Sequence, residues 1–333
     1  MSLTPPARKR PRLSPRARTT LPRLAVNATL AGLWASSLLA LLVFFLNPDI
    51  SLRLRSFPPV AGPMMLFYAP LSGLVWAVLA GGVRLFATFR VRVPWVGFRP
   101  FWRFLVADLC LLAAVYALNL SRNQDYLPSD MNTHLLGATL FLSLAAALFA
   151  MDALWRGLSR QRLRPWPRLV AALLLTGALL GIRERYREVV PPRSASEIEP
   201  SRPAADLVFI GLQGAAPDDL LPLLAAGQLP FLKRLFQQGS SAPLKGFRPP
   251  HLPAAWATIL TGALPPAHGI IETVVHDPPG PGRSLRIAPS GIGFAGMERL
   301  GLVAAVKRRD LVPPIPTLDR ILRRCGYRVV ASG

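Results

Sequence analysis

Residues 206–270 read DLVFIGLQGAAPDDLLPLLAAGQLPFLKRLFQQGSSAPLKGFRPPHLPAAWATILTGALPPAHGI. The stretch opens with an apolar run, Leu207 to Leu212, whose β-forming residues predict a buried strand. A proline and two acidic residues follow at 217–219, and they suit the first turn of a helix. A strand that leads into a turn and a helix places the next residues at the carboxyl edge of a sheet, where α/β proteins commonly hold their active sites.

The alternation of strands and helices continues through the C-terminal part of the chain. Clusters of proline and glycine separate short apolar runs, and Thr317 is placed to cap a last helix. This order predicts a partial α/β domain with a mainly parallel sheet. The predicted elements are strand 206–212, helices 217–226 and 229–238, strand 242–247, helix 253–261, a Pro/Gly-rich loop 274–293, helix 318–325 and strand 327–331.

The composition indicates a membrane protein. Apolar residues make up 51% of the 333 residues and charged residues only 17%, which is too apolar for an ordinary soluble domain. The net charge is +22, but the basic residues gather beside apolar spans and not in a patch with interleaved aromatic residues. We therefore expect no nucleic-acid partner. The two cysteines, Cys110 and Cys325, set no disulfide framework.

Five apolar spans predict a multi-pass α-helical membrane domain over residues 25–183. A helix needs about 20 residues to cross the apolar core of a bilayer. The third and fifth spans are shorter, so a buried-helix interpretation stays open for them. Residues 1–24 form a basic tail that we expect to be disordered, and residues 184–205 have the composition of a linker before the domain at 206–333. The spans are placed near 24–46, 63–86, 104–120, 135–154 and 169–182.

The basic residues between the spans predict the orientation in the membrane. From the tail onward, the tail and the four junctions carry 7, 2, 5, 1 and 5 Lys/Arg, with Arg84 at the end of the second span counted in its junction, which is the alternation of the positive-inside rule. This places the protein in the inner, cytoplasmic membrane with its N-terminus in the cytoplasm and its C-terminal domain in the periplasm. Four arginines from Arg183 to Arg193 run against the pattern, and we expect them to pair with Glu184 and Glu188.

One acidic residue, Asp108, lies inside a predicted span. A carboxylate deep in a membrane is costly and is often functional. Asp108 lies about one turn after the predicted start of its span at residue 104, so an interfacial position is favoured. Asp152 likewise lies near the end of the fourth span.

Five short segments in the C-terminal part resemble a known family. In order, they are FIGLQGAAPD, LPFLKRLFQQGS, PPHLPAAWATILTG, PPAHGI and PTLDRILRRCGYRVV. Together they resemble the first half of a domain of the alkaline phosphatase superfamily, in the type I phosphodiesterase/nucleotide pyrophosphatase branch. The resemblance covers residues 206–331. Five spans before such a domain are similar in plan to the synthases and phosphoethanolamine transferases of bacterial envelopes.

The resemblance implies where a catalytic site would lie. Members of the family use two divalent metals, usually zinc, to polarise a phosphate ester and to activate a Ser or Thr nucleophile. The family's first metal ligand, an Asp, corresponds to Gln213. The nucleophile, counted back from Thr261-Gly262, corresponds to Leu252, and a slip of one residue would place His251 there. The later ligand motifs do not follow, so we assign no catalytic residue, metal ligand or cofactor to this chain. His268 is interpreted as structural support.

Three functions are compatible with these observations. The first is a membrane-anchored, extracytoplasmic phosphodiesterase-like protein that is catalytically inactive or incomplete as this chain, since both site positions are substituted. The second is a metal-dependent phosphodiesterase or phosphotransferase that acts on envelope phosphate esters. The third is a non-enzymatic membrane scaffold. As partners we expect membrane lipids, together with another protein or a second copy of the chain at the open edge of the incomplete sheet.

Overall fold

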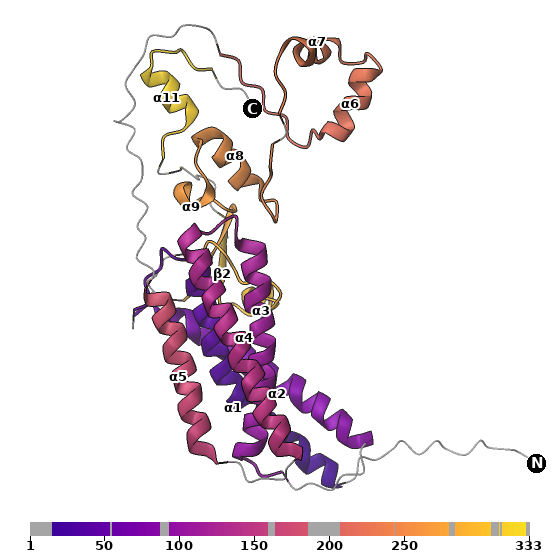
Figure 1. Cartoon of the computed structure of the whole chain (residues 1–333), viewed down its shortest axis with the longest axis vertical. Helices are drawn as coiled ribbons and strands as arrows, with labels where there is room; N and C mark the ends of the chain where they lie inside the picture. The colour runs from indigo at the N-terminus through magenta and orange to yellow at the C-terminus, as the bar shows by residue number, and fades with distance from the viewer. Residues whose placement is uncertain are drawn as a thin grey trace, which may run out of the picture.

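Five long helices form a bundle at the N-terminal end of the chain, and successive helices run in opposite directions (Figure 1). Each contains a stretch that is long and apolar enough to cross a membrane. The computed structural model describes residues 15–53, 55–86, 93–158, 164–185, 207–242, 244–279, 284–307, 313 and 315–330. The five helices are α1 (Pro15–Leu46), α2 (Phe57–Phe86), α3 (Phe98–Asn123), α4 (Ser129–Leu158) and α5 (Pro165–Glu184).

The prediction of five membrane-capable helices is confirmed, with different ends. The third and fifth helices have 26 and 20 residues, so both reach the length that a crossing requires. The disordered tail was predicted to reach residue 24. This boundary is wrong, because α1 already begins at Pro15. Residues 1–14 and nearly all of the predicted linker lie outside the described residues.

Helix α1 lies at the centre of the bundle. From Leu38 to Leu46 every side chain is at most 4% exposed, including Phe44 and Phe45. A helix that is apolar on every side is stable only where neighbours cover its whole circumference. Helices α2, α3 and α5 all contact α1, and residues from the C-terminal region join the same core.

Helix α5 presents one narrow stripe to the bundle. Its buried residues repeat at intervals of three and four, which places them on one face. Arginines occupy both ends of this stripe, and near its middle the Trp34 Nε1 group of α1 donates to Thr176 Oγ1 at 3.0 Å. The stripe consists of Arg168, Ala172, Leu175, Leu179 and Arg183.

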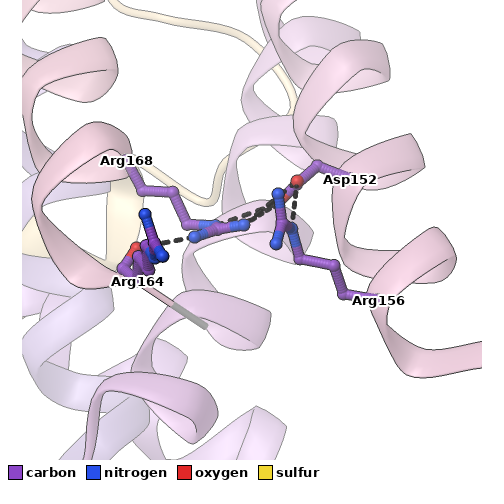
Figure 2. A network of polar contacts seen from close by, with 4 residues as sticks. All are labelled: Asp152, Arg156, Arg164 and Arg168. Carbon is purple, nitrogen blue, oxygen red and sulfur yellow. Dashed lines mark hydrogen bonds and ion pairs between the residues drawn. The ribbon is translucent and has the colours of Figure 1, made fainter. Parts of the chain in front are cut away.

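The first arginine of the stripe, Arg168, ties α5 to the end of α4 (Figure 2). Its Nε and Nη2 atoms donate to the two carboxylate oxygens of Asp152 at 2.9 and 3.0 Å. Arg156 Nε donates to the same carboxylate at 2.6 Å, and Arg168 Nη1 donates to the Arg164 carbonyl at 2.6 Å. Two-pronged arginine–carboxylate pairing fixes orientation as well as distance. The pairing therefore sets how the start of α5 lies against α4.

The other end of the stripe, Arg183, caps the end of α1. Its Nε donates to the Phe44 carbonyl at 2.8 Å, and Nη2 donates to the carbonyls of Pro48 and Ile50 at 3.2 and 3.0 Å. The last carbonyls of a helix have no partner within it, and a cation there is favourable. We expected Arg183 to pair with Glu184 and Glu188, and Glu188 lies outside the described residues. Arg183 is 3% exposed and lies against backbone carbonyls at and beyond the end of α1.

Short helices make up most of the C-terminal region, and four of them lie where the sequence predicts them. Proline stands in the first turn of α6, α7 and α8, where its missing N–H costs nothing. Helix α8 ends at Gly262, whose φ of 65° terminates the helix without strain. The four are α6 (Pro217–Ala225), α7 (Pro230–Gln238), α8 (Leu252–Thr261) and α11 (Leu318–Arg324); α9 (Pro265–His268) and α10 (Ala295–Arg299) are additional.

The mainly parallel sheet is not formed among the described residues. The sheet there has two antiparallel strands, β1 (Val274–Asp277) and β2 (Ala304–Lys307), and β1 lies within the predicted loop 274–293. The described parts of the strands predicted at 206–212, 242–247 and 327–331 have no strand structure. Residues 207–212 are mostly exposed, and Val208 is 79% exposed. A strand forms only when a neighbour supplies backbone partners, and its own composition does not provide one.

Residues 284–303, here called the docked segment, pack into the helical bundle. Their apolar side chains belong to the same core as α1 to α4. Two buried asparagines bind the backbone of this segment: Asn47 accepts from the N–H groups of Arg286 and Ile287 at 2.7 and 3.0 Å, and Asn119 accepts from Ser290 N–H at 2.8 Å. The C-terminal region is thus joined to the bundle through its interior. The buried apolar residues of the segment are Leu285, Ile287, Phe294, Met297 and Val303.

Candidate functional site

The two positions that the resemblance singled out lie on adjoining segments. Leu252 is the first residue of α8 and is 47% exposed, and Gln213 is also exposed. Gly211, two residues before Gln213, lies so close to Trp256 of α8 that an added Cβ would be 2.3 Å from the indole. Only glycine fits this contact. The structure therefore brings the stretch before α6 alongside α8, as the chemistry of the family would require.

A histidine–carboxylate pair lies beside the nucleophile position. His251 immediately precedes α8, and its Nδ1 atom is 2.7 Å from Glu272 Oε1. The ring of Tyr126 meets the His251 ring edge to face, with centroids 4.9 Å apart. The sequence analysis missed Glu272 and Tyr126, because Tyr126 belongs to the connection between α3 and α4 and no local pattern links it to residue 251.

The same loop binds the end of the membrane helices. Arg248 N–H donates to Asp125 Oδ2 at 2.9 Å, and the Tyr126 hydroxyl donates to the Pro249 carbonyl. The Tyr126 ring lies 5.7 Å from that of Phe247. Burial is the main cause that raises the pKa of Tyr126 to about 12, so its hydroxyl keeps its proton and remains a donor at neutral pH. The segment before α8 is thus anchored on the α3–α4 connection.

The residue types at this site limit its chemistry. The carboxylate can orient the His251 imidazole, an arrangement that suits a general base. Leu252 carries no oxygen, so it cannot attack phosphorus. Gln213 offers a neutral amide, which is a poor zinc ligand beside Asp, His and Cys. The residues at the family's ligand and nucleophile positions therefore do not fit two metals. In the part of the chain that the structure describes, no three His, Cys, Asp or Glu residues gather at one point.

His268 is buried next to this site and has a structural role. Its Nδ1 atom accepts from Ile270 N–H at 3.1 Å, so the proton belongs on Nε2, which lies 3.0 Å from Thr258 Oγ1. The side chain joins α9 to α8 and is 1% exposed. Burial lowers the pKa of His268 to about 4, so that the ring is neutral at pH 7. This geometry agrees with the interpretation of His268 as support.

The low pKa of His268 predicts an acid-sensitive fold. Between pH 6.5 and about 4 the unfolded chain binds a proton at this residue and the folded chain does not, so stability falls as the pH falls. Above pH 6.5 the ring is neutral in both states and contributes no pH dependence. We expect a loss of about 3 kcal/mol across this interval. Thermal unfolding between pH 7.5 and 4.5 measures it.

A glutamine at position 268 provides the comparison for that experiment. His268→Gln removes the titration, so its melting temperature should fall less steeply with acid than that of the unchanged protein. His134→Gln is the matched control, since His134 lies on α4 away from this unit. Equal acid sensitivity of the unchanged protein and His268→Gln would contradict the assignment.

Asp108 lies further from the start of its helix than predicted. Helix α3 begins at Phe98 and not at residue 104, so Asp108 lies about 15 Å along the helix from its start. The side chain is 5% exposed. It accepts hydrogen bonds from Trp76 Nε1 at 2.7 Å and from Ser72 Oγ at 3.1 and 3.2 Å. The start of the span was predicted too late, at the first unbroken apolar run, and the interfacial position of Asp108 stays a prediction.

Comparison with known proteins supports the resemblance over part of the chain. Residues 207–284 match the family model of type I phosphodiesterase/nucleotide pyrophosphatase, which is less than a quarter of the chain. The match includes α6 to α9 and β1, and it stops before α11. No curated protein and no solved structure matches the chain.

Proposed function

We propose that this protein is a multi-pass protein of the cytoplasmic membrane. Its extracytoplasmic, phosphodiesterase-like domain serves in binding to a partner and catalyses no reaction. The alkaline-phosphatase-like fold of that domain is part of the proposal. It is supported by the order of α6, α7, α8 and α9 within the matched residues 207–284. Five helices that can each cross a membrane precede it.

The observation that carries the proposal is Leu252 at the start of α8. Phosphoryl transfer in this family begins with attack by a hydroxyl group at that point, and a leucine side chain has no lone pair to attack with. The exposed hydrocarbon instead resembles part of a binding surface. A neutral amide at Gln213 is a second, independent departure from the chemistry of the family.

The contacts of the preceding loop support a role in attachment. Residues 247–251 use their backbone and rings to hold Asp125 and Tyr126, as described above. In a catalytic domain, an edge that receives phosphate esters has to stay open to solvent. Here the loop 247–251, at one side of that edge, contacts the connection between α3 and α4. This favours a scaffold that is fixed to its membrane domain.

The proposed orientation rests on the distribution of basic residues. The alternation of 7, 2, 5, 1 and 5 Lys/Arg favours a cytoplasmic N-terminus. Arg183 weakens this pattern if it is counted as a free charge near the last span. Its guanidinium is buried against backbone carbonyls, so it belongs to the helix packing. Discounting it strengthens the case for an extracytoplasmic C-terminal domain.

A second candidate is a phosphodiesterase or phosphotransferase that acts on envelope phosphate esters. The pair of His251 and Glu272, 2.7 Å apart beside the nucleophile position, favours it. An imidazole that a carboxylate orients can serve as a nucleophile or as a general base for water. The full chain would then act through His251 and not through residue 252.

Hydrolysis of bis(p-nitrophenyl) phosphate by the purified full-length protein, with and without added zinc, separates the two candidates. We expect no turnover above that of His251→Gln, because neither a hydroxyl nucleophile nor the first carboxylate ligand is present. His134→Gln is the matched control. Turnover that disappears in His251→Gln and persists in His134→Gln would overturn the non-catalytic proposal and establish the second candidate.

A further inference from the structure

A cavity of about 220 Å³ lies inside the helical bundle, between α1, α2 and α3. It extends from the level of Asp108 to that of Val115, a height of about 10 Å along α3. Most of its surface is hydrocarbon, and polar atoms enter from Ser36, Tyr68, Ser72 and Trp76. An apolar cavity of roughly 150 Å³ is large enough to admit benzene. This one has room for a longer apolar group.

The polar end of the cavity is the Asp108 carboxylate. Ser72 and Trp76 both donate to it, and both are neutral. Two carboxylate oxygens offer about four lone-pair sites, so the group has capacity for a further donor. Among the described residues, no Lys, Arg or His lies within ion-pair distance of Asp108. A buried carboxylate in a membrane normally has such a partner, and its presence marks a functional site.

A second polar group in the wall has no partner. The Tyr68 hydroxyl is shielded from solvent and forms no hydrogen bond within the described structure. Burying a hydroxyl without a partner is unfavourable. A ligand with a polar group would satisfy both this hydroxyl and Asp108. The two residues lie on facing helices, α2 and α3.

The cavity borders the docked segment and is accessible from the side of the bundle. Gly291 and Ile292 of the docked segment form part of its wall. Leu71, Val75 and Leu111 also line it, and they are 41%, 44% and 59% exposed on the surface of the bundle. In a membrane that surface faces lipid chains. Entry is therefore from the bilayer, between α2 and α3, and not from water.

We propose that this cavity binds a single-chain amphiphile from the bilayer, whose alkyl chain fills the hydrocarbon part and whose hydrogen-bond-donating head group, best a primary amine, pairs with Asp108. The carboxylate supplies the acceptor that an amine requires. The Tyr68 hydroxyl supplies a second polar contact. Because Ile292 belongs to both the cavity wall and the docked segment, the ligand also contacts the C-terminal region.

Two probes of equal chain length test the proposal with the full-length protein in lipid nanodiscs. Dodecylamine carries the donor, and 1-methoxydodecane has the same chain without one. Native mass spectrometry or equilibrium dialysis gives the affinity for each. We expect the unchanged protein to prefer the amine by about tenfold or more, the ratio that one hydrogen bond to a charged group provides.

Three variants distinguish the cavity from general partition into lipid. Asp108→Asn keeps an acceptor for Trp76 and should remove most of the preference for the amine. Asp130→Asn makes the same change at an exposed residue of α4 and should leave the preference intact. Leu111→Trp fills the side entrance and should weaken the binding of both probes. Leu140→Trp, on the exposed face of α4, should leave their binding unchanged.

The result that overturns the proposal is equal binding of the two probes by the unchanged protein. A preference that survives in Asp108→Asn overturns it as well. If Asp108→Asn does not fold, the comparison of Leu111→Trp with Leu140→Trp still decides, because the proposal requires the first to weaken dodecylamine binding and the second to leave it unchanged.

Discussion

Asn47→Leu is expected to release the docked segment from the helical bundle. Asn47 is 1% exposed and bonds three backbone groups of that segment: it accepts from Arg286 N–H at 2.7 Å and Ile287 N–H at 3.0 Å, and it donates to the Ile287 carbonyl at 2.9 Å. Leucine has a similar volume and no polar atom, so all three groups would be left without a partner. Each unsatisfied buried group costs about 1–3 kcal/mol, which gives a total on the order of 3–9 kcal/mol.

Hydrogen exchange is the direct measurement, because the amides of residues 285–297 should exchange much faster in Asn47→Leu while those of α3 and α4 change little. Asn132→Leu is the matched control. Asn132 donates to the Gln124 and Leu127 carbonyls at 2.7 and 3.4 Å, near the start of α4, and neither acceptor belongs to the docked segment. Unchanged exchange at residues 285–297 in Asn47→Leu would show that apolar packing alone holds the segment.

A double-mutant cycle with Asn119 extends this test. Asn119 bonds both backbone groups of Ser290, three residues further along the same segment. If the segment docks as one unit, the first mutation already releases it and the second adds little. The effects of Asn47→Leu and Asn119→Leu should therefore be less than additive. Full additivity would indicate two independent attachments.

Arg183→Met should be nearly as damaging, for a different reason. Arg183 is 3% exposed and donates to the carbonyls of Phe44, Pro48 and Ile50. Methionine retains the apolar stem and removes every donor, so these carbonyls lose their charged partner at the end of α1. Hydrogen bonds to charged groups each contribute about 1.5–3 kcal/mol, so the loss of three is expected to cost on the order of 4–9 kcal/mol. The melting temperature of the purified protein reports it.

Two further substitutions at this end of α5 give the experiment its controls. Arg183→Lys keeps the charge but lacks the planar guanidinium that can donate to several separate carbonyls. Its melting temperature should therefore lie between those of the unchanged protein and Arg183→Met. Arg185→Met removes an exposed arginine just after α5 and should alter stability by less than about 0.5 kcal/mol. The capping role is refuted if Arg183→Met melts at the same temperature as Arg185→Met.

The helices could be predicted because their signals are local. Apolar length identified all five membrane-capable helices, and it needed no knowledge of neighbours. Proline in the first turn and glycine after the last marked α8. Ends were less certain: α3 begins at Phe98, six residues before the predicted start, because its first turns are aromatic and basic. That error placed Asp108 too close to the start of its helix.

The sheet could not be predicted in the same way. Residues 207–212 have the composition of a buried strand, yet they lie exposed without a neighbouring strand. Of the two strands that do form, β1 lies in a stretch whose prolines and glycines predicted a loop. A helix closes its hydrogen bonds within itself, whereas a strand depends on residues far along the chain. β1 pairs with β2 some thirty residues later.

In the candidate site, too, residue positions could be predicted from local motifs, whereas contacts between distant residues could not. Motif order alone predicts that Gln213 and Leu252 stand at positions where the family keeps a carboxylate and a hydroxyl. The partners of His251 came only from the structure, since Tyr126 is 125 residues away and Glu272 lies beyond two helices.

The sequence by itself therefore determined the five apolar helices and four of the short helices after them, because each depends on residues close together in the chain. Tertiary structure alone decided how the C-terminal region is used. The apolar run at 207–212, which was predicted to be a buried strand, is exposed. Residues 284–303 pack into the bundle. Asn47 and Ile287 are 240 positions apart, and their hydrogen bonds exist only because the packed helices exclude water from both.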